Sequence, residues 1–98
     1  MDRIQNEKCD VVGFMDERYI YDDCHCLMGQ MDDSRVLDIH SQVLARIDGN
    51  FVRDHLNRTV AWLDSDSVLD MESFKVISRV TAISRKMACA AAFFAFFK

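Results

Sequence analysis

The chain has 98 residues and a mass of 11.3 kDa, half of its residues are hydrophobic, and its formal net charge is −4. This length predicts one domain with a modest core, and the apolar content excludes a disordered tail. The chain has no proline and only three glycines, which disfavours an all-β sandwich because such folds need many turn-forming residues. We therefore expect a single helical domain over residues 1–98.

Charge is distributed unevenly along the chain. Residues 1–40 carry ten acids and four bases, whereas residues 41–98 carry six acids and eight bases. Broad binding to a phosphate backbone needs clustered lysine and arginine, so nucleic acid is not an expected partner. The first eight residues are polar and lack a signal-peptide core, and four cysteines without a secretion signal indicate reduced thiols. We expect a cytoplasmic protein.

Apolar spacing predicts two helices in the first half of the chain. The first runs from about residue 6 to residue 21, and residues 22–33, which have no regular period, are expected to form a loop. Ser34 is a good N-cap candidate for the second helix because acids precede it. The apolar residues of this second helix recur at helical spacing: Val36, Val43, Leu44, Ile47 and Phe51.

Three more helices are predicted in the second half. The third runs over residues 53–63, and the polar stretch 64–67 separates it from the fourth, which has Phe74, Ile77 and Val80 on one face. The fifth covers residues 86–97. No internal repeat is apparent in the chain, so the expected architecture is a bundle of five helices.

The C-terminal run is unusually apolar. Residues 87–97 are uncharged and almost wholly hydrophobic, but a membrane-spanning helix needs about 20 such residues. A helix that is apolar on every side is buried centrally. Because a chain of this length has little left to surround such a helix, we expect a partner or a second copy to cover it, and therefore a homodimer.

Three stretches share a pattern with a known family. Residues 10–20 hold an apolar pair followed by an aromatic and a large aliphatic residue. Residues 43–55 hold a leucine, an Asp-Gly pair and a large apolar residue, and the similarity continues from Trp62 to Val80. Together these stretches resemble motifs of the B-cell-lymphoma-two (Bcl) family of apoptosis regulators, and the short length is most similar to divergent viral survival-promoting members.

This resemblance implies a shortened all-α bundle that holds the death-motif helix of pro-apoptotic partners in a hydrophobic groove and so inhibits apoptosis in a host cell. Recognition of this kind needs an apolar trough and one charge that fixes the register. By the resemblance, an arginine supplies that charge, and both Arg79 and Arg85 are candidates. The same resemblance gives the remaining groove residues: Phe51, His55, Thr59, Trp62, Val80 and Ser84. Association with mitochondria is left open.

The sequence also offers residues for two other classes of function. A structural or adaptor bundle that self-associates through the C-terminal apolar helix is the alternative to the groove. Residues 24–26, Cys-His-Cys, together with Cys9 or with Asp22 and Asp23, offer ligands of the kind zinc prefers, but structural zinc sites favour wider spacing and a second cysteine pair. We therefore expect no metal and no cofactor. The three histidines lack a nucleophile motif around them, so we also expect no enzymatic activity.

Overall fold

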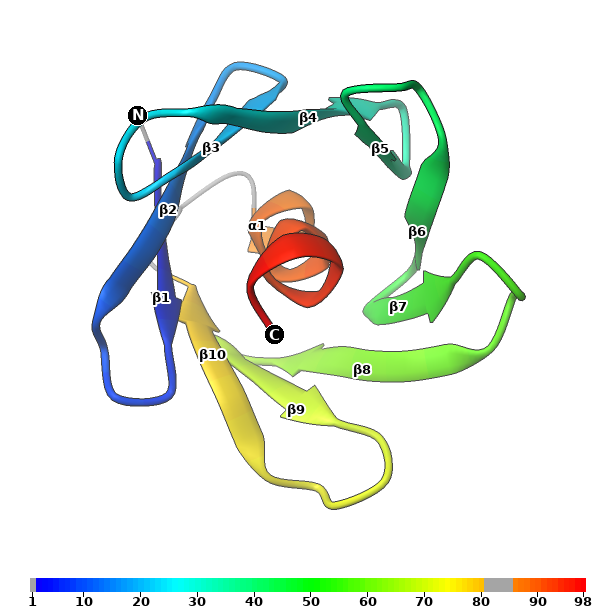
Figure 1. The fold of residues 1–98 in the computed structure, drawn as a ribbon. Coiled ribbons are helices and arrows are strands. Elements are labelled where there is room, and N and C mark those ends of the chain that lie inside the picture. Colours follow the sequence, from blue (N-terminus) through cyan, green and yellow to red (C-terminus); the bar gives the residue numbers. More distant parts are fainter. Residues whose placement is uncertain (1, 81–85) are drawn as a thin grey trace.

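The computed structural model describes residues 2–80 and 86–98 and shows a closed antiparallel β-barrel with a helix at its centre (Figure 1). Every strand pairs with its neighbours in the sequence, and the last strand pairs with the first. The strands of this described part are β1 (Asp2–Asn6), β2 (Val11–Asp16), β3 (Tyr19–Asp22), β4 (Leu27–Asp32), β5 (Arg35–Asp38), β6 (Val43–Asp48), β7 (Phe51–Asp54), β8 (Thr59–Asp64), β9 (Ser67–Asp70) and β10 (Val76–Val80). The central helix comprises α1 (Lys86–Ala92) and a π-helical turn, η1 (Phe93–Phe97).

The barrel is built from five hairpins on a repeat of sixteen residues. The first strand of each hairpin carries one fully buried β-branched residue that faces the core: Ile4, Ile20, Val36, Val52 and Val68. The fifth hairpin has a turn longer by one residue, since the Asp70 N–H donates to the carbonyl of Lys75, whereas the Asp54 N–H donates to that of Arg58. The prediction that the chain has no internal repeat is therefore wrong.

Aspartate makes the turns that glycine and proline were expected to make. In each hairpin the first strand ends in an Asn or Asp whose Oδ1 accepts two backbone N–H groups of the turn at 2.8–3.2 Å. These residues again lie sixteen apart: Asn6, Asp22, Asp38, Asp54 and Asp70. Such Asx turns replace a backbone turn and tolerate a left-handed residue nearby. Four of these turns contain a residue with left-handed backbone, at φ of 64–65°: Cys9, His25, Ser41 and Asn57.

The all-α prediction is wrong because hairpins reproduce helical spacing. Val36 lies on β5, while Val43 and Ile47 lie on β6, seven and eleven residues further along. On a helix this spacing places three residues on one face. Here two antiparallel strands contribute them instead: Val36 and Ile47 face the core, while Val43 lies opposite Leu37 beyond a β-bulge. Likewise, the segment 22–33, which was expected to be a loop, contains β4.

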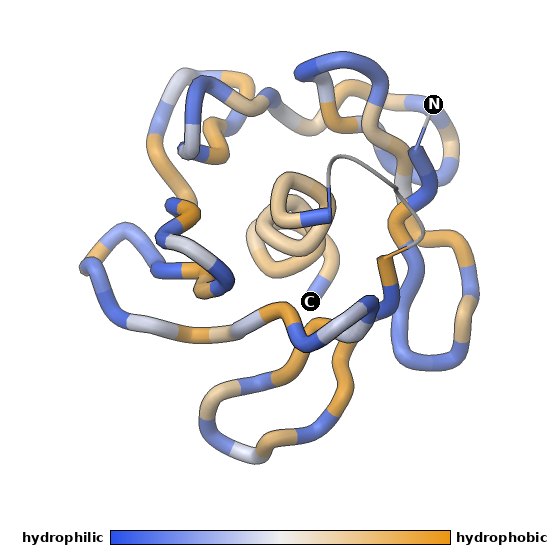
Figure 2. The backbone as a smooth tube through the Cα atoms, turned by 180° about the vertical axis from the view of Figure 1, so that it is seen from behind, coloured by the Kyte–Doolittle hydropathy of each residue, from blue (hydrophilic) through white to orange (hydrophobic). Residues whose placement is uncertain are grey.

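A helix does form at the C-terminus, and the helix predicted over residues 86–97 is confirmed. Its surroundings differ from the expectation, because the strands of the same chain enclose it (Figures 1 and 2). Cys89, Ala90, Ala91, Ala92 and Phe93 are all buried. The homodimer stays a prediction, but the exposed helix that motivated it is absent. Within residues 2–80 and 86–98, no helix is long and apolar enough to cross a membrane.

Small residues on the strands make room for the helix. They pair with the buried residues of the first strands, one in each hairpin: Gly13, Gly29, Ala45, Ala61 and Ser78. A Cβ atom on Gly29 would lie 2.6 Å from Cζ of Phe96 and 2.1 Å from the carbonyl oxygen of Leu37. At the fifth position, the Ser78 hydroxyl donates to the carbonyl of Gln5 where β10 meets β1. The small residues of the strands thus leave the space that the side chains of the central helix fill.

Candidate functional site

The residues predicted to line a groove do not come together in one. Val80 is only 4% exposed and belongs to the hydrophobic core. His55 lies exposed in the turn between β7 and β8, and Arg79 lies on the outer face of β10. Ser84 and Arg85 lie outside the described residues, so the choice between Arg79 and Arg85 is not resolved. No helical groove exists in the part of the chain that the structure describes.

Two of the predicted residues do meet, on the outer wall of the barrel. Phe51 on β7 lies directly opposite Trp62 on β8, and Trp62 lies opposite Leu69 on β9. We call these three residues the apolar row. Phe51 is 43% exposed, and the ring of Trp62 meets that of Phe74 edge to face with centroids 5.4 Å apart. Phe74 itself is 66% exposed, so this side of the barrel presents a large apolar side chain to solvent. Thr59, the remaining predicted groove residue, lies at the start of β8.

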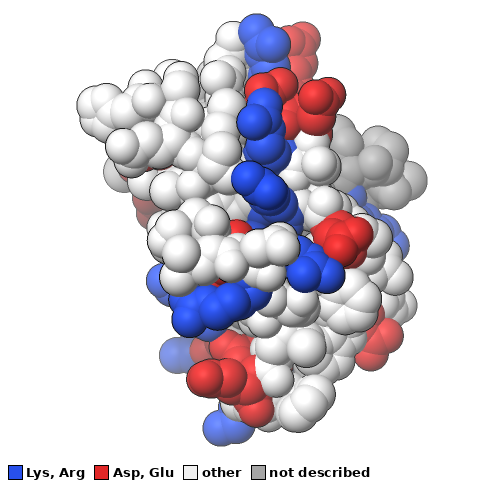
Figure 3. Space-filling model, turned by 90° about the vertical axis from the view of Figure 1, so that its right-hand side faces the viewer, with Lys and Arg blue, Asp and Glu red and all other residues white. Residues whose placement is uncertain are grey.

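A second row on the same wall consists of arginines. Arg35 on β5 lies opposite Arg46 on β6, and Arg46 lies opposite Arg53 on β7. These three residues form the arginine row. Like charges directly opposite each other on neighbouring strands destabilise a sheet. Figure 3 views this side of the barrel and shows lysine and arginine side chains gathered in a band across it.

Two aspartates neutralise the ends of the arginine row. Nη2 of Arg35 lies 2.8 Å from Oδ2 of Asp32, and Nη2 of Arg53 lies 2.9 Å from Oδ2 of Asp48. The middle residue, Arg46, is exposed and forms no ion pair with any residue in 2–80 or 86–98. Nε of Arg53 is buried and has no hydrogen-bond acceptor. Arg46 therefore keeps its donors and its positive charge available, whereas the unpaired Nε of Arg53 is not accessible to a ligand.

The arginine row was not predicted, because Arg35 and Arg46 fell eleven residues apart on the second predicted helix and Arg53 fell on the third. The signal was the sixteen-residue repeat. Once β5, β6 and β7 are recognised as consecutive antiparallel strands, their short turns set the register that brings Arg35, Arg46 and Arg53 opposite one another. The alternation of buried Ala45 with exposed Arg46 then places the row on the outside.

The cysteine-rich turn does not assemble the zinc ligands that were considered. The ring of His25 stacks on Phe14, with centroids 4.9 Å apart and planes 6° apart. Asp22, Asp23 and Cys24 have ligand atoms within 4.8 Å of one another, but Oδ1 of Asp22 is already bonded to the turn backbone. The charge of Asp23 raises the pKa of the Cys24 thiol, which disfavours the thiolate that a metal needs. Of the ligands named for zinc, only Asp22, Asp23 and Cys24 come together, and the absence of a metal stays a prediction.

Comparison with known proteins identifies the architecture. A family model described as "5-fold beta-flower protein" matches residues 1–98. No curated protein matches the chain, and no solved structure matches it. The match agrees with the five hairpins around a central helix. The resemblance to the Bcl family is therefore wrong, and so are the inhibition of apoptosis and the self-associating helical bundle. The expected death-motif partners rested on that resemblance and lose their basis.

Proposed function

The chain belongs to the 5-fold beta-flower proteins, and we propose that on this scaffold it acts as a non-catalytic binding module for an acidic segment of a partner protein. The segment would lie on the outer wall, across the arginine row and the apolar row. The observation that carries this proposal is the arginine row itself. Three opposed arginines cost stability, and a bound carboxylate removes that cost.

The amount of charge points to a segment with one or two carboxylates. Three arginines face two aspartates in the row, so about one positive charge is uncompensated. A long polyanion such as nucleic acid would also meet the carboxylates of Asp32 and Asp48 and be repelled. A side-chain carboxylate of the partner needs only the fork of Arg46, which binds it with two parallel hydrogen bonds.

The apolar row offers a surface on which an apolar side chain of the partner can pack, in addition to the charged contact with the arginine row. Phe51 and Arg53 lie two residues apart on β7, so their side chains stand on the same face at a separation of about 7 Å. The two rows are therefore neighbours, and one extended segment can place a carboxylate on the first and an apolar side chain on the second. Large aromatic side chains and arginine are the residue types that dominate binding energy at protein interfaces.

Trp62 offers a direct test, because it is the only tryptophan in the chain. Its fluorescence is measured while a ten-residue peptide of alternating glutamate and phenylalanine is added at low salt. We expect saturable binding that weakens as the salt concentration rises, because the contacts to the arginine row are exposed and are screened. A matched peptide with glutamine in place of glutamate should bind at least tenfold more weakly, since a charged hydrogen bond contributes about 1.5–3 kcal/mol.

The chain provides a matched pair of variants. Arg46 and Arg79 occupy equivalent outward positions of the third and fifth hairpins, so Arg46→Glu and Arg79→Glu change the charge equally. We expect Arg46→Glu to raise the Kd of the acidic peptide at least tenfold, and Arg79→Glu to change it by less than twofold. Equal effects of the two variants, or none, would contradict the proposal. So would a fluorescence change that depends on protein concentration alone, which would identify a second copy of the chain as the occupant.

A further inference from the structure

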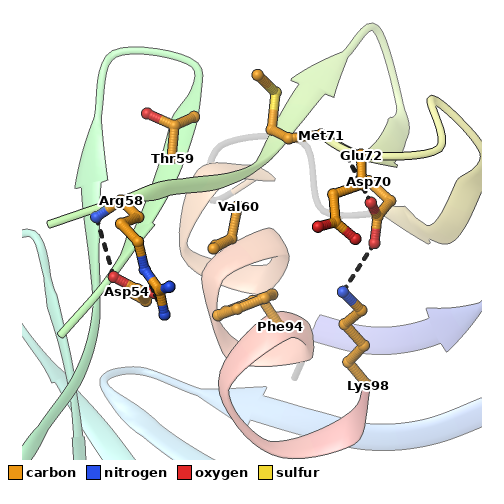
Figure 4. A pocket seen from close by; sticks show the side chains of 9 residues that line it. All are labelled: Asp54, Arg58, Thr59, Val60, Asp70, Met71, Glu72, Phe94 and Lys98. Carbon is orange, nitrogen blue, oxygen red and sulfur yellow. Dashed lines mark hydrogen bonds and ion pairs between the residues drawn. The ribbon is translucent and has the colours of Figure 1, made fainter. Parts of the chain in front are cut away.

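A pocket of about 370 Å³ opens beside the C-terminal end of the central helix, between the β7–β8 turn and the β9–β10 turn (Figure 4). Its apolar lining comes from Val60 on β8, Phe94 on η1 and Met71. Charged side chains flank it on two sides. Asp54 and Arg58 stand at the first turn, and the carboxylates of the second turn stand opposite them (Figure 4). The pocket thus combines an apolar floor with a charged rim.

The pocket already holds one organic cation, which is the ammonium group of Lys98. Its Nζ donates to Oδ2 of Asp70 at 2.8 Å and lies 5.4 Å from the centroid of the Phe94 ring. An ammonium between a carboxylate and an aromatic face is the arrangement by which proteins bind organic cations. The hydrogen bond from Lys98 lowers the pKa of Asp70, so this carboxylate is charged at neutral pH.

The remaining charges leave the pocket negative. Asp54 is matched by Arg58, whose Nε and Nη2 both lie 2.9 Å from Oδ2, and Asp70 is matched by Lys98. Glu72 lines the pocket, is exposed, and has no ion pair within the described residues. Two cations therefore face three carboxylates. A pocket with an apolar floor and one surplus carboxylate favours a cationic ligand with an apolar stem.

We propose that this pocket binds a small primary aliphatic amine, with the ammonium group beside the carboxylate of Glu72 and the carbon chain against Val60 and Phe94. The carbon chain of such a ligand competes with Lys98 for the face of Phe94. The pocket shares no lining residue with the two rows, although its Thr59 lies opposite Arg53, and the proposal does not depend on the function proposed for the rows.

Titration with hexylamine, followed through backbone amide shifts of the ¹⁵N-labelled protein, tests the proposal. We expect saturable shifts around the β8 strand and the β9–β10 turn, with a Kd of about 1–10 mM for a ligand of this size. Glu72→Gln should raise that Kd at least threefold. Glu7→Gln removes an equal charge from the exposed turn between β1 and β2 and should leave the Kd unchanged.

A second variant is expected to act in the opposite direction. Lys98→Met removes the competing ammonium and should lower the Kd for hexylamine about threefold or more, because the ligand gains an unpaired Asp70 carboxylate. Circular dichroism establishes that each variant is folded before it is titrated. The proposal is overturned if hexan-1-ol binds as tightly as hexylamine. It is also overturned if Glu7→Gln weakens binding as much as Glu72→Gln does, or if Lys98→Met fails to tighten it.

Discussion

Gly29 is a position where both the neighbouring strand and the central helix leave no room for a side chain. An alanine there would place its Cβ 2.1 Å from the carbonyl oxygen of Leu37 and 2.6 Å from Cζ of Phe96. The first neighbour is backbone of the paired strand β5, so a rotation of a side chain cannot relieve the clash. Overpacking of a core costs about 1–3 kcal/mol, and the lower entropy of unfolded alanine returns about 0.4–1 kcal/mol.

We therefore expect Gly29→Ala to lower the free energy of unfolding by about 1–2 kcal/mol, which corresponds to a fall in Tm of about 4–16 °C for a domain of this size. Urea unfolding should show a lower midpoint with an unchanged m-value. Ala45 holds the equivalent place in the third hairpin, where a Cβ fits. Ala45→Gly should cost about 1–2 kcal/mol from the lost methyl group and the added chain entropy.

A double-mutant cycle with Phe96→Leu tests whether the helix really touches this strand. Shortening the ring removes the contact at 2.6 Å but leaves the one with Leu37, so the double variant should regain only part of the loss. Strict additivity of the two substitutions, or a Gly29→Ala variant as stable as the original chain, would refute the enclosure of the helix by the barrel.

Three further predictions concern the turns. Asp54→Ala should lower Tm by about 5–10 °C and Asp54→Asn by less, because asparagine keeps the Oδ1 that accepts the two backbone N–H groups, as Asn6 does in the first hairpin. The backbone N–H of Arg58 chiefly lowers the pKa of Asp54, and the Lys98 hydrogen bond chiefly lowers that of Asp70. The stabilisation that these two carboxylates give is therefore complete above the unfolded-state pKa of about 3.9 and is lost as pH falls through the lower folded-state pKa values. Tm measured from pH 6 to pH 2 should therefore begin to fall at about pH 4. The fall should be less steep in Asp54→Asn, which has one titrating carboxylate fewer. Ser65 has φ of 59° at the repeat position where Gly49 has 63°, so Ser65→Gly should raise Tm by about 2–4 °C while Gly49→Ala lowers it.

The C-terminal helix was predictable from sequence, and the strands were missed for a specific reason. Residues 87–97 are apolar on every side, a pattern that only a buried helix satisfies at this length. The strands of this chain are four to six residues long, too short for alternation alone to outweigh the three- and four-residue spacings that hairpin turns create. The decisive clue was aspartate at residues 22, 38, 54 and 70, because a turn-forming residue at constant spacing marks a repeat.

The site was harder to predict than the fold, because it depends on register. Arg35, Arg46 and Arg53 are eleven and seven residues apart, and nothing in that spacing brings them together until the strands are paired. Phe51 and Trp62 were predicted to line a groove between helices, and they do lie side by side, but on neighbouring strands. Their contact results from pairing across β7 and β8. A single shift of one residue would have turned both side chains into the barrel.

The five hairpins also indicate where function can reside on this scaffold. Their inward positions are nearly uniform, since each must fit the same central helix. Their equivalent outward positions, one in each hairpin, carry four different residue types: Phe14, Gln30, Arg46, Trp62 and Arg79. Packing against the helix imposes no choice at these places, so the differences between hairpins are not required by the barrel. The arginine row across β5, β6 and β7 and the apolar row across β7, β8 and β9 are such differences, and the binding proposed for this wall depends on them.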